Sequence, residues 1–390
     1  MNGDGRDRPP APRPPRPPRP WRLLLSGAGH VGGGFLDMLE DRRAALEAGF
    51  GVDLRVCGIA EYGGGVLDPD GLDLGPIRAA LATGEPLAAL PGIGCPRMTP
   101  REMAETAEAE ILLEATPVSL VDGEPGLGAV RTALTRGMHV VLANKGPLAL
   151  AFHELAELAD LGDGWGRLYR QPDEGAPPRP RLRFSATVAG ALPVVNIGRR
   201  DLAGDRITRI EAVFNGTSQS ILRAMETGRG FDDAVADAQA RGIAEADPAL
   251  DVDGFDAACK LVITVNAVLG GRATLADVAI EGIRAVQSRE VAAAVHAGQR
   301  LVPLCLAELD EDSSGPDGTC GYRLSVRPAS LPQDHPLARL TPDEMGVVFY
   351  TDYLDRLFGA SLEPGPGPAS AAMLRDVLDI VWSETCHTRS

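Results

Sequence analysis

The chain has few cysteines, and their positions are not typical of a disulfide scaffold or a metal centre. Six cysteines occur in 390 residues without a CxxC pair. Disulfide frameworks and structural zinc sites depend on closely and regularly spaced cysteines. The sequence therefore predicts reduced thiols and a cytoplasmic location, and it names no metal-ligand residues.

Long hydrophobic runs and an excess of basic residues are also missing. No apolar run reaches the roughly 18 residues that a membrane-spanning helix needs, and no apolar segment follows the amino terminus as in a secretory signal. The chain has 38 lysines and arginines against 54 aspartates and glutamates, a formal net charge of -16. This charge disfavours nucleic acid and anionic membrane as partners, so a small anionic cofactor must be bound by local backbone amides.

The length and the hydrophobic content of 44% allow two or three domains with buried cores. Residues 1–20 are mostly proline and arginine, which predicts a disordered or polyproline-like tail. A basic proline-rich ligand for a partner domain is the alternative. Residues 164–181 have a similar composition and predict an exposed loop or a flexible lid.

A strand, a glycine turn and a helix follow the tail. Leu23 to Ser26 predicts a buried strand, and the helical pattern extends through Leu46. Between them lies a GxGxxG motif, in which Gly27 permits the turn, Gly29 admits a pyrophosphate and Gly32 allows close helix packing. The expected dinucleotide-binding residues are Gly27, Gly29, His30, Val31 and Gly32.

The second strand, Leu54 to Ile59, is followed by an acid that bears on the choice of cofactor. Glu61 stands where a carboxylate binds ribose hydroxyls, and no lysine or arginine occurs between Tyr62 and Val66 to meet a 2′-phosphate. Glu61 therefore favours NAD. NADP stays open, because Glu61 follows Gly32 by more than the usual spacing of about 20 residues, and a strand-end acid is often simply solvated.

Polar residues follow two further predicted strands. Ala109 to Ala115 ends at Thr116, and His139 to Leu142 ends at Asn144 and Lys145. Ligands of parallel α/β sheets bind outside the carboxyl ends of the strands. We therefore expect these three residues where a nicotinamide and its substrate meet.

Between Arg183 and Val195 the sequence predicts a strand that enters a Gly-Ala-Leu-Pro bend. It predicts another strand from Ile207 to Phe214, which stops at an Asn-Gly turn. Thr217 or Ser218 is expected to cap the next helix, whose first amides suit the carboxylate of an amino-acid substrate. Turn chemistry alone explains the same residues.

The segment from Gly242 to Lys260 contains several acidic residues and one lysine close to the start of a predicted helix. Asp253 is expected to cap a largely apolar helix that brings Asp256 and Lys260 onto one face, opening into a cleft. A lysine beside acids in a cleft is a candidate proton donor. An ordinary ion pair between residues four apart explains the spacing equally well.

Together these segments resemble homoserine dehydrogenase. The motifs are the glycine loop, Ala-Asn-Lys-Gly-Pro-Leu-Ala (143–149), Ala-Thr-Val-Ala-Gly-Ala-Leu-Pro (186–193), Asn-Gly-Thr-Ser (215–218) and the acidic block 242–260. The resemblance covers most of residues 21–385. It implies a cytoplasmic homodimer that interconverts L-homoserine and L-aspartate 4-semialdehyde with NAD or NADP, a step towards threonine and methionine.

The resemblance also implies roles for single residues. Lys260 would donate the proton, Asp256 would position it, and Lys145 would steer the carbonyl. The implied substrate contacts are Glu245 and Asp251 at the ammonium, with Asp256, Gly216 and Thr217. The implied cofactor contacts, beyond the glycine loop and Glu61, are Thr116, Asn144, Lys145, Gly242 and Gly367.

Three positions depart from the family pattern. Ser185 stands where the family commonly has a glutamate that helps to hold a monovalent cation, so the sequence leaves open whether a cation binds near Val188 to Leu192. Ala191 and Ala212 replace common glycines, and each is expected to add a methyl group near the site. They motivate an alternative, a related dehydrogenase for another amino aldehyde or hydroxy amino acid; a non-catalytic cofactor-binding sensor is the third hypothesis.

The predicted fold is α/β. Residues 21–150 form a Rossmann-type dinucleotide-binding domain that a helix at 369–385 completes. Residues 151–332 form an α+β catalytic and dimerisation domain, and residues 333–368 return to the cofactor domain.

Overall fold

The structure, a computed structural model, describes residues 20–161, 179–310 and 321–387. The predicted tail at 1–20 and the insertion at 164–181 therefore lie almost wholly outside the described residues. Within the described part, no helix has both the length and the hydropathy that crossing a bilayer requires.

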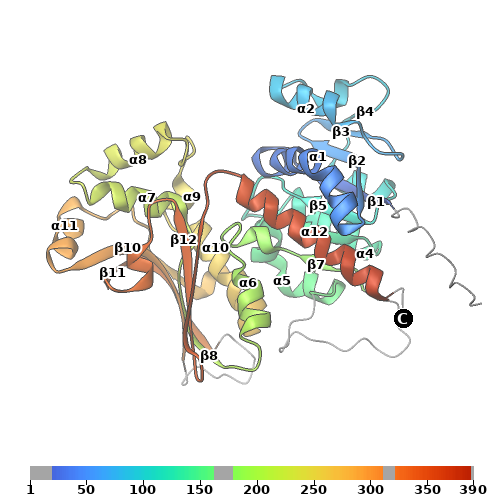
Figure 1. The fold of residues 1–390 in the computed structure, drawn as a ribbon. Helices are drawn as coiled ribbons and strands as arrows, with labels where there is room; N and C mark the ends of the chain where they lie inside the picture. Colours follow the sequence, from blue (N-terminus) through green and yellow to red (C-terminus); the bar gives the residue numbers. More distant parts are fainter. Residues whose placement is uncertain (1–19, 162–178, 311–320, 388–390) are drawn as a thin grey trace, which may run out of the picture.

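The first domain is built on a seven-stranded sheet in the order β4-β3-β2-β1-β5-β6-β7 (Figure 1). Its parallel strands are β1 (Pro20–Ser26), β2 (Asp53–Glu61), β5 (Ile111–Glu114), β6 (His139–Leu142) and β7 (Leu182–Arg183). The edge strands β3 (Gly64–Leu67) and β4 (Gly94–Pro96) are antiparallel. The three consecutive leucines 23, 24 and 25 are fully buried, because successive side chains point to opposite faces and both faces are covered by helices.

Helices cover both faces of this sheet. One face carries α1 (His30–Phe50), α2 (Leu74–Thr83) and the closing helix α12 (Gly367–His387), which packs along α1 although it comes from the other end of the chain (Figure 1). The other face carries α3 (Pro100–Thr106), α4 (Gly126–Thr135) and α5 (Gly146–Leu158). A short 3-10 turn, η1 (Leu87–Ala89), precedes β4. This arrangement confirms the predicted Rossmann-type domain.

The second domain is a six-stranded sheet in the order β13-β12-β8-β10-β11-β9, antiparallel except for the pair β9 and β11. Its strands are β8 (Ile207–Val213), β9 (Val278–Ile280), β10 (Gln299–Leu309), β11 (Tyr322–Pro332), β12 (Glu344–Thr351) and β13 (Asp355–Leu362). Its helices are α7 (Gly216–Met225), α8 (Phe231–Ala240), α9 (Ala249–Val252), α10 (Phe255–Thr264) and α11 (Ser288–His296). The chain passes between the domains through η2 (Ser185–Thr187), which packs against α12 and β6. The second domain also has the short helical segments α6 (Val194–Asn196), η3 (Ile197–Asp201), η4 (Val265–Leu269), η5 (Leu275–Asp277) and η7 (Pro336–Arg339).

The predicted boundary at residue 332 is wrong. Strands β12 and β13 lie in the second sheet, where β12 pairs with β8, so most of 333–368 does not return to the cofactor domain. The physical reason is burial: Val347, Val348 and Phe349 are all fully buried, as in a strand covered on both faces. Only the short connection after Leu362 leads to α12.

The strand predicted after Arg183 is also wrong, although the chain does bend at Gly190 as expected. Only Leu182–Arg183 pairs with β6, and the chain then turns. The backbone N–H of Ser185 donates to the Asp376 carboxylate, and Ala189 and Gly190 both have positive φ angles, so no ladder forms.

One hydrophobic cluster joins the two domains. It includes Leu112 and Leu142 of the first sheet, Leu261 of α10 and Phe349 of β12. Helix α10 packs against α5, so its amino-terminal end lies beside the carboxyl end of β6. The seam between the domains is where the candidate site forms.

Candidate active site

A cavity of about 710 Å³ lies between the domains. Its wall includes Val31 of α1, the end of β6, the start of α7, the turn after α8, and the connection after β13. The predicted site residues in this wall are Val31, Lys145, Gly216, Thr217, Gly242, Asp251, Asp256 and Lys260. Residues far apart in the sequence therefore meet here.

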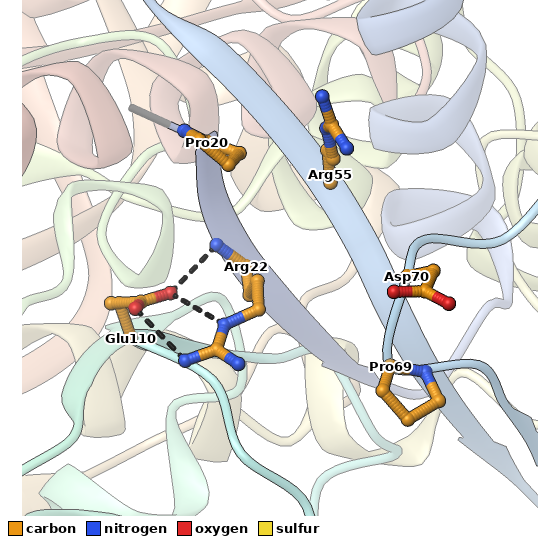
Figure 2. Close-up of a pocket in the computed structure, with 6 residues that line it drawn as sticks. All are labelled: Pro20, Arg22, Arg55, Pro69, Asp70 and Glu110. Carbon is orange, nitrogen blue, oxygen red and sulfur yellow. Dashed lines mark hydrogen bonds and ion pairs between the residues drawn. The ribbon is translucent and has the colours of Figure 1, made fainter. Parts of the chain in front are cut away.

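A second cavity, of about 320 Å³, lies at the opposite end of the first sheet. Figure 2 shows Arg22 hydrogen-bonded to Glu110, with Arg55 on the neighbouring strand. Pro20, which lines this cavity, begins β1, whereas the glycine loop follows the end of β1. This cavity is thus remote from the predicted site. Its ion pair between Arg22 and Glu110 links β1 to the residue that precedes β5.

The centre of the larger cavity is a carboxylate held between two ammonium groups. Lys145 Nζ lies 2.9 Å from Asp256 Oδ1, and Lys260 Nζ lies 2.7 Å from Asp256 Oδ2. Lys260 also donates a hydrogen bond of 2.7 Å to the Phe214 carbonyl. Lys145 follows β6 of the first domain, and the other two residues are on α10 of the second, so the cluster spans the seam.

These two lysines are the only lysines in the printed sequence; every other basic side chain among the 38 is an arginine. Arginine keeps its proton at any physiological pH, whereas an ammonium group can give its proton away. The scarcity of lysine is a further signal in the sequence, independent of the motifs. It picks out the same two residues that the structure brings together.

The charges of the cluster stabilise one another. Burial alone would raise the pKa of Asp256, but the ammonium groups of Lys145 and Lys260 outweigh it and hold that pKa well below its usual range. Burial would lower the pKa of Lys145, yet the Asp256 carboxylate raises it. Asp256 therefore stays ionised and keeps a protonated amine at the cavity wall.

Asn215 is a site residue that the sequence analysis missed. Its side-chain amide donates to Asp251 Oδ1 at 2.7 Å and to Asp256 Oδ2 at 2.8 Å. Its side-chain oxygen accepts from the Ser218 backbone N–H at 2.7 Å, so Asn215, and not Thr217 or Ser218, caps α7. An asparagine three residues before a serine in the first helical turn is a recognisable capping signal. One side chain thus fixes the helix start and two carboxylates.

Asp251 is the second acid of the cavity. Burial and the nearby Asp256 carboxylate raise its pKa, while the hydrogen bond from Asn215 opposes the rise. Thr217, which lines the same wall, donates its hydroxyl hydrogen to the Ile243 carbonyl. An acid in this position suits the ammonium group of an amino acid, and the contact of Asp251 with the substrate stays a prediction.

The start of α10 differs from the prediction. Gly254, with a φ of 87°, is the residue before the helix, and Asp253 instead forms an exposed ion pair with Arg284. A side chain at Gly254 would adopt a strained backbone conformation and approach Ile280 to 3.1 Å. The glycine therefore makes the sharp entry that turns Asp256 towards the cavity.

The cavity wall does not include Glu245, Gly367 or Ala212, nor several of the expected cofactor-binding residues, which are Gly27, Gly29, His30, Gly32, Glu61, Thr116 and Asn144. Glu245 is exposed, and Gln239 donates to its backbone carbonyl at 3.1 Å. Gly367 begins α12, whereas Gly365 lines the cavity. Ala212, expected near the site, is fully buried in β8, so its methyl group contributes to the core and not to the substrate cavity.

The glycine loop fits a dinucleotide. A Cβ atom on Gly27 would lie 2.6 Å from the Ala115 carbonyl oxygen, and one on Gly32 would lie 2.0 Å from that of Gly27, so neither position tolerates a side chain. The space at Gly29 is open, and α1 begins after it without a side-chain cap. Its first amides suit a pyrophosphate. The Glu61 carboxylate accepts a hydrogen bond from the Ala28 backbone N–H, beside the loop.

Comparisons with known proteins agree with this geometry. A family model described as homoserine dehydrogenase matches residues 193–378, and one described as homoserine dehydrogenase, NAD binding domain, matches residues 27–167. The NAD(+)-dependent homoserine dehydrogenase of Pseudomonas canavaninivorans is 33% identical over 370 residues, 94% of this chain and 97% of that protein. The chain belongs to the homoserine dehydrogenase family.

Solved structures of homoserine dehydrogenases share the fold. A putative homoserine dehydrogenase from Archaeoglobus fulgidus is 29% identical with a TM-score of 0.74, and the match covers 92% of this chain and 99% of that one. A hyperthermophilic archaeal homoserine dehydrogenase mutant in complex with NADPH is 25% identical with a TM-score of 0.74, over 94% and 98% of the two chains. The chain is thus an oxidoreductase with a nicotinamide-binding domain, and the alternative hypotheses are not favoured.

The position at which this chain departs from the family glutamate is tied to the closing helix. Ser185 donates through its backbone N–H and its hydroxyl to the Asp376 carboxylate of α12, both at 2.7 Å. Burial raises the pKa of Asp376 to about 6 against these hydrogen bonds. Across the described residues, no group of three or more histidine, cysteine or acidic side chains is placed to hold a metal ion. Ser185 therefore anchors α12 to the segment that follows β7.

Thr116 and Asn144 lie at the strand ends as predicted, but inside a buried hydrogen-bonded cluster. Asn144 donates to Thr116 Oγ1 at 3.2 Å and accepts from the Gly146 N–H at 2.9 Å. The Thr116 N–H and hydroxyl both donate to Glu114, whose other carboxylate oxygen has no hydrogen-bond partner among the described residues. Neither residue lines the cavity, so their contact with the cofactor stays a prediction.

Glu114 predicts a pH dependence of stability. Burial raises its pKa from 4.5 to about 7. Between these values the folded protein holds a proton that the unfolded chain has lost, so the free energy of unfolding falls as the pH rises through this window. Glutamine at this position does not titrate. Between pH 5 and pH 8 we therefore expect the free energy of unfolding of Glu114→Gln to rise relative to that of the wild type by up to ~3 kcal/mol, at about 1.4 kcal/mol per pKa unit. Urea unfolding at both pH values measures this, with the exposed Glu105→Gln as the control; equal pH dependence in all three proteins would contradict it.

Proposed function

We propose that this chain interconverts L-homoserine and L-aspartate 4-semialdehyde with NAD or NADP. The observation that carries the proposal is the cluster of Lys145, Asp256 and Lys260 in the wall of a cavity that also reaches Val31 beside the glycine loop. Membership of the homoserine dehydrogenase family supports the same reaction. The pathway role, towards threonine and methionine, follows from that product.

The chemistry needs a proton at the substrate oxygen. When bound, the nicotinamide supplies or accepts the hydride. Lys260 donates the proton to the oxygen of the forming alcohol, and Lys145 stabilises the negative charge that develops on the same oxygen. Asp256 pairs with both amines and holds them in place. Asp251, held by Asn215, takes the substrate ammonium.

The first experiment follows nicotinamide absorbance with L-homoserine and then with L-aspartate 4-semialdehyde, each with NAD(H) and NADP(H). We expect turnover in both directions. A folded protein that binds the cofactor but converts neither compound would overturn the proposed reaction and leave an amino aldehyde of different length as the substrate.

Glu61 supports a preference for NAD within this function. Its carboxylate lies beside the glycine loop, where it would repel a 2′-phosphate and bind ribose hydroxyls. We expect Glu61→Ser to lower the preference for NAD over NADP by about tenfold or more, because a like-charge contact at the phosphate is removed. The control is Asp53→Ser at the opposite end of β2. Steady-state kinetics with both cofactors measure the ratio of kcat/KM for NAD to that for NADP. An unchanged ratio would mean that Glu61 only holds the glycine loop and does not select the cofactor.

We further propose a homodimer in the cytoplasm with no nucleic-acid or membrane partner. Tyr353, Leu354, Phe358 and Leu362, in and around β13, are large apolar side chains with 43% or more of their surface exposed. Apolar surface of this kind suits a subunit contact. Cys57, Cys95, Cys259 and Cys305 are free thiols, which suits a reducing compartment. Light scattering of the purified protein tests the dimer.

A further inference from the structure

The cavity has a third cationic side chain that the reaction outlined above does not use. Among the described residues that line it, the cations are Lys145, Arg241 and Lys260. Both lysines are within 2.9 Å of the Asp256 carboxylate. Arg241 comes from the end of α8 and belongs to no such cluster. Its guanidinium group is therefore the cation of this wall that is most available to a ligand.

The contacts of Arg241 are long. Its nearest carboxylate oxygens are on Asp343, at 3.6 Å, and on Asp237, at 3.7 Å, and 45% of the side chain is exposed. Asp237 forms a shorter ion pair, of 2.7 Å, with Arg229. A guanidinium group prefers shorter, two-pronged hydrogen bonds to a carboxylate. A ligand carboxylate would therefore compete well for Arg241.

Arg241 lies beside the start of α7. One of its guanidinium nitrogens is 3.4 Å from the Ser220 hydroxyl, and Gly216 and Thr217, which begin the same helix, line the cavity. The amino-terminal end of a helix favours negative charge. Asp343, whose carboxylate now faces Arg241, lines the cavity from the turn before β12. The positive part of the wall thus combines a helix start with a guanidinium group.

The substrate of the proposed function is a zwitterion that must be oriented at three points. Its reacting oxygen belongs at Lys260 and its ammonium group at Asp251, which leaves the α-carboxylate. We propose that Arg241 binds this carboxylate, in place of Asp343, and so determines the specificity for substrates with a free carboxylate. The proposal rests on the proposed function and adds a residue to it.

The test compares L-homoserine with L-homoserinamide, in which a neutral amide replaces the carboxylate. For Arg241→Gln we expect kcat/KM for L-homoserine to fall by about tenfold or more, mainly through KM, because a charge-assisted contact is lost. The value for the amide should stay within about twofold of the wild type. Arg241→Lys keeps the charge without the two-pronged geometry and should recover part of the preference.

The matched control is Asp343→Asn. If Arg241 and Asp343 only latch the two sides of the cavity together, both variants break the latch and should lose activity on both compounds alike. If Arg241 binds the substrate carboxylate, Asp343→Asn removes a competitor, so KM for L-homoserine should stay the same or fall. Equal losses in the two variants, or an unchanged preference in Arg241→Gln, would overturn the assignment of Arg241.

The failure of the function is distinguishable from the failure of this assignment. A wild type that binds the cofactor but does not oxidise L-homoserine refutes the proposed reaction, and the role of Arg241 falls with it. A wild type that oxidises L-homoserine and has the same preference as Arg241→Gln refutes the role of Arg241 alone. Thermal unfolding and NADH binding of each variant establish that it is folded.

Discussion

Replacing Lys260 by methionine is expected to lower kcat by about 10²- to 10⁴-fold, the usual contribution of a positioned proton donor. Methionine keeps most of the side-chain volume in a position that is 13% exposed, but it cannot donate a proton or pair with Asp256. Cofactor binding should stay close to the wild type, because the glycine loop lies in the other domain. Steady-state kinetics with L-homoserine and a fluorescence titration with NADH separate the two effects.

The matched control for Lys260→Met is Lys260→Arg. Lys260→Arg keeps the positive charge and the pairing with Asp256, but guanidinium does not release a proton near neutral pH. We expect Lys260→Arg to be nearly as inactive as Lys260→Met. Recovery of most of the activity in Lys260→Arg would mean that Lys260 supplies charge and not a proton.

Replacing Asp256 by asparagine is expected to cost about 3–5 kcal/mol of folding free energy, as when one partner of a buried ion pair is removed. The change leaves the ammonium groups of Lys145 and Lys260 facing each other without the carboxylate that holds both. Turnover should fall as well, because the carboxylate that holds both amines in place is then missing. Urea unfolding and steady-state kinetics measure the two losses.

The pH dependence of this loss follows from the direction of the pKa shift. The folded pKa of Asp256 lies below its ordinary value of 3.8, so its stabilising effect is present above that value and is lost only as the pH falls through the folded pKa. The deficit of Asp256→Asn should therefore be the same at pH 6 and pH 8. Asp253→Asn, which removes an exposed ion pair with Arg284, should cost less than about 1 kcal/mol. Similar losses at positions 253 and 256 would argue against a buried cluster.

Local patterns were enough to predict the four parallel strands β1, β2, β5 and β6 and the first helix of the first domain. The leucines 23 to 25, the glycine loop and the strand ends at Thr116 and Asn144 follow rules that depend on neighbours in the sequence. The helix after the glycine turn was predicted to extend through Leu46 for the same reason, and α1 spans His30–Phe50. Parallel α/β units are locally encoded, so their order and the position of a site at their carboxyl ends follow from the chain.

Contacts between distant segments were not predictable in this way. The role of Asn215 depends on Asp251 and Asp256, which are 36 and 41 residues away, and that of Arg241 depends on Asp343. The predicted second domain stopped too early, at residue 332, because β12 pairs with β8 across more than a hundred residues and β13 pairs with β12. Asp253 has a side chain suited to capping, yet Gly254 supplies the left-handed turn that the α10 entry needs.

The most direct test of the central claim is the fate of a deuterium label. L-Aspartate 4-semialdehyde would be reduced by a cofactor that carries deuterium at the transferring position of the nicotinamide, and the product analysed by NMR and mass spectrometry. The account predicts L-homoserine with one deuterium on the alcohol carbon, made by the wild type and far more slowly by Lys260→Met. Label-free homoserine, or no product from a folded protein that binds the cofactor, would contradict it.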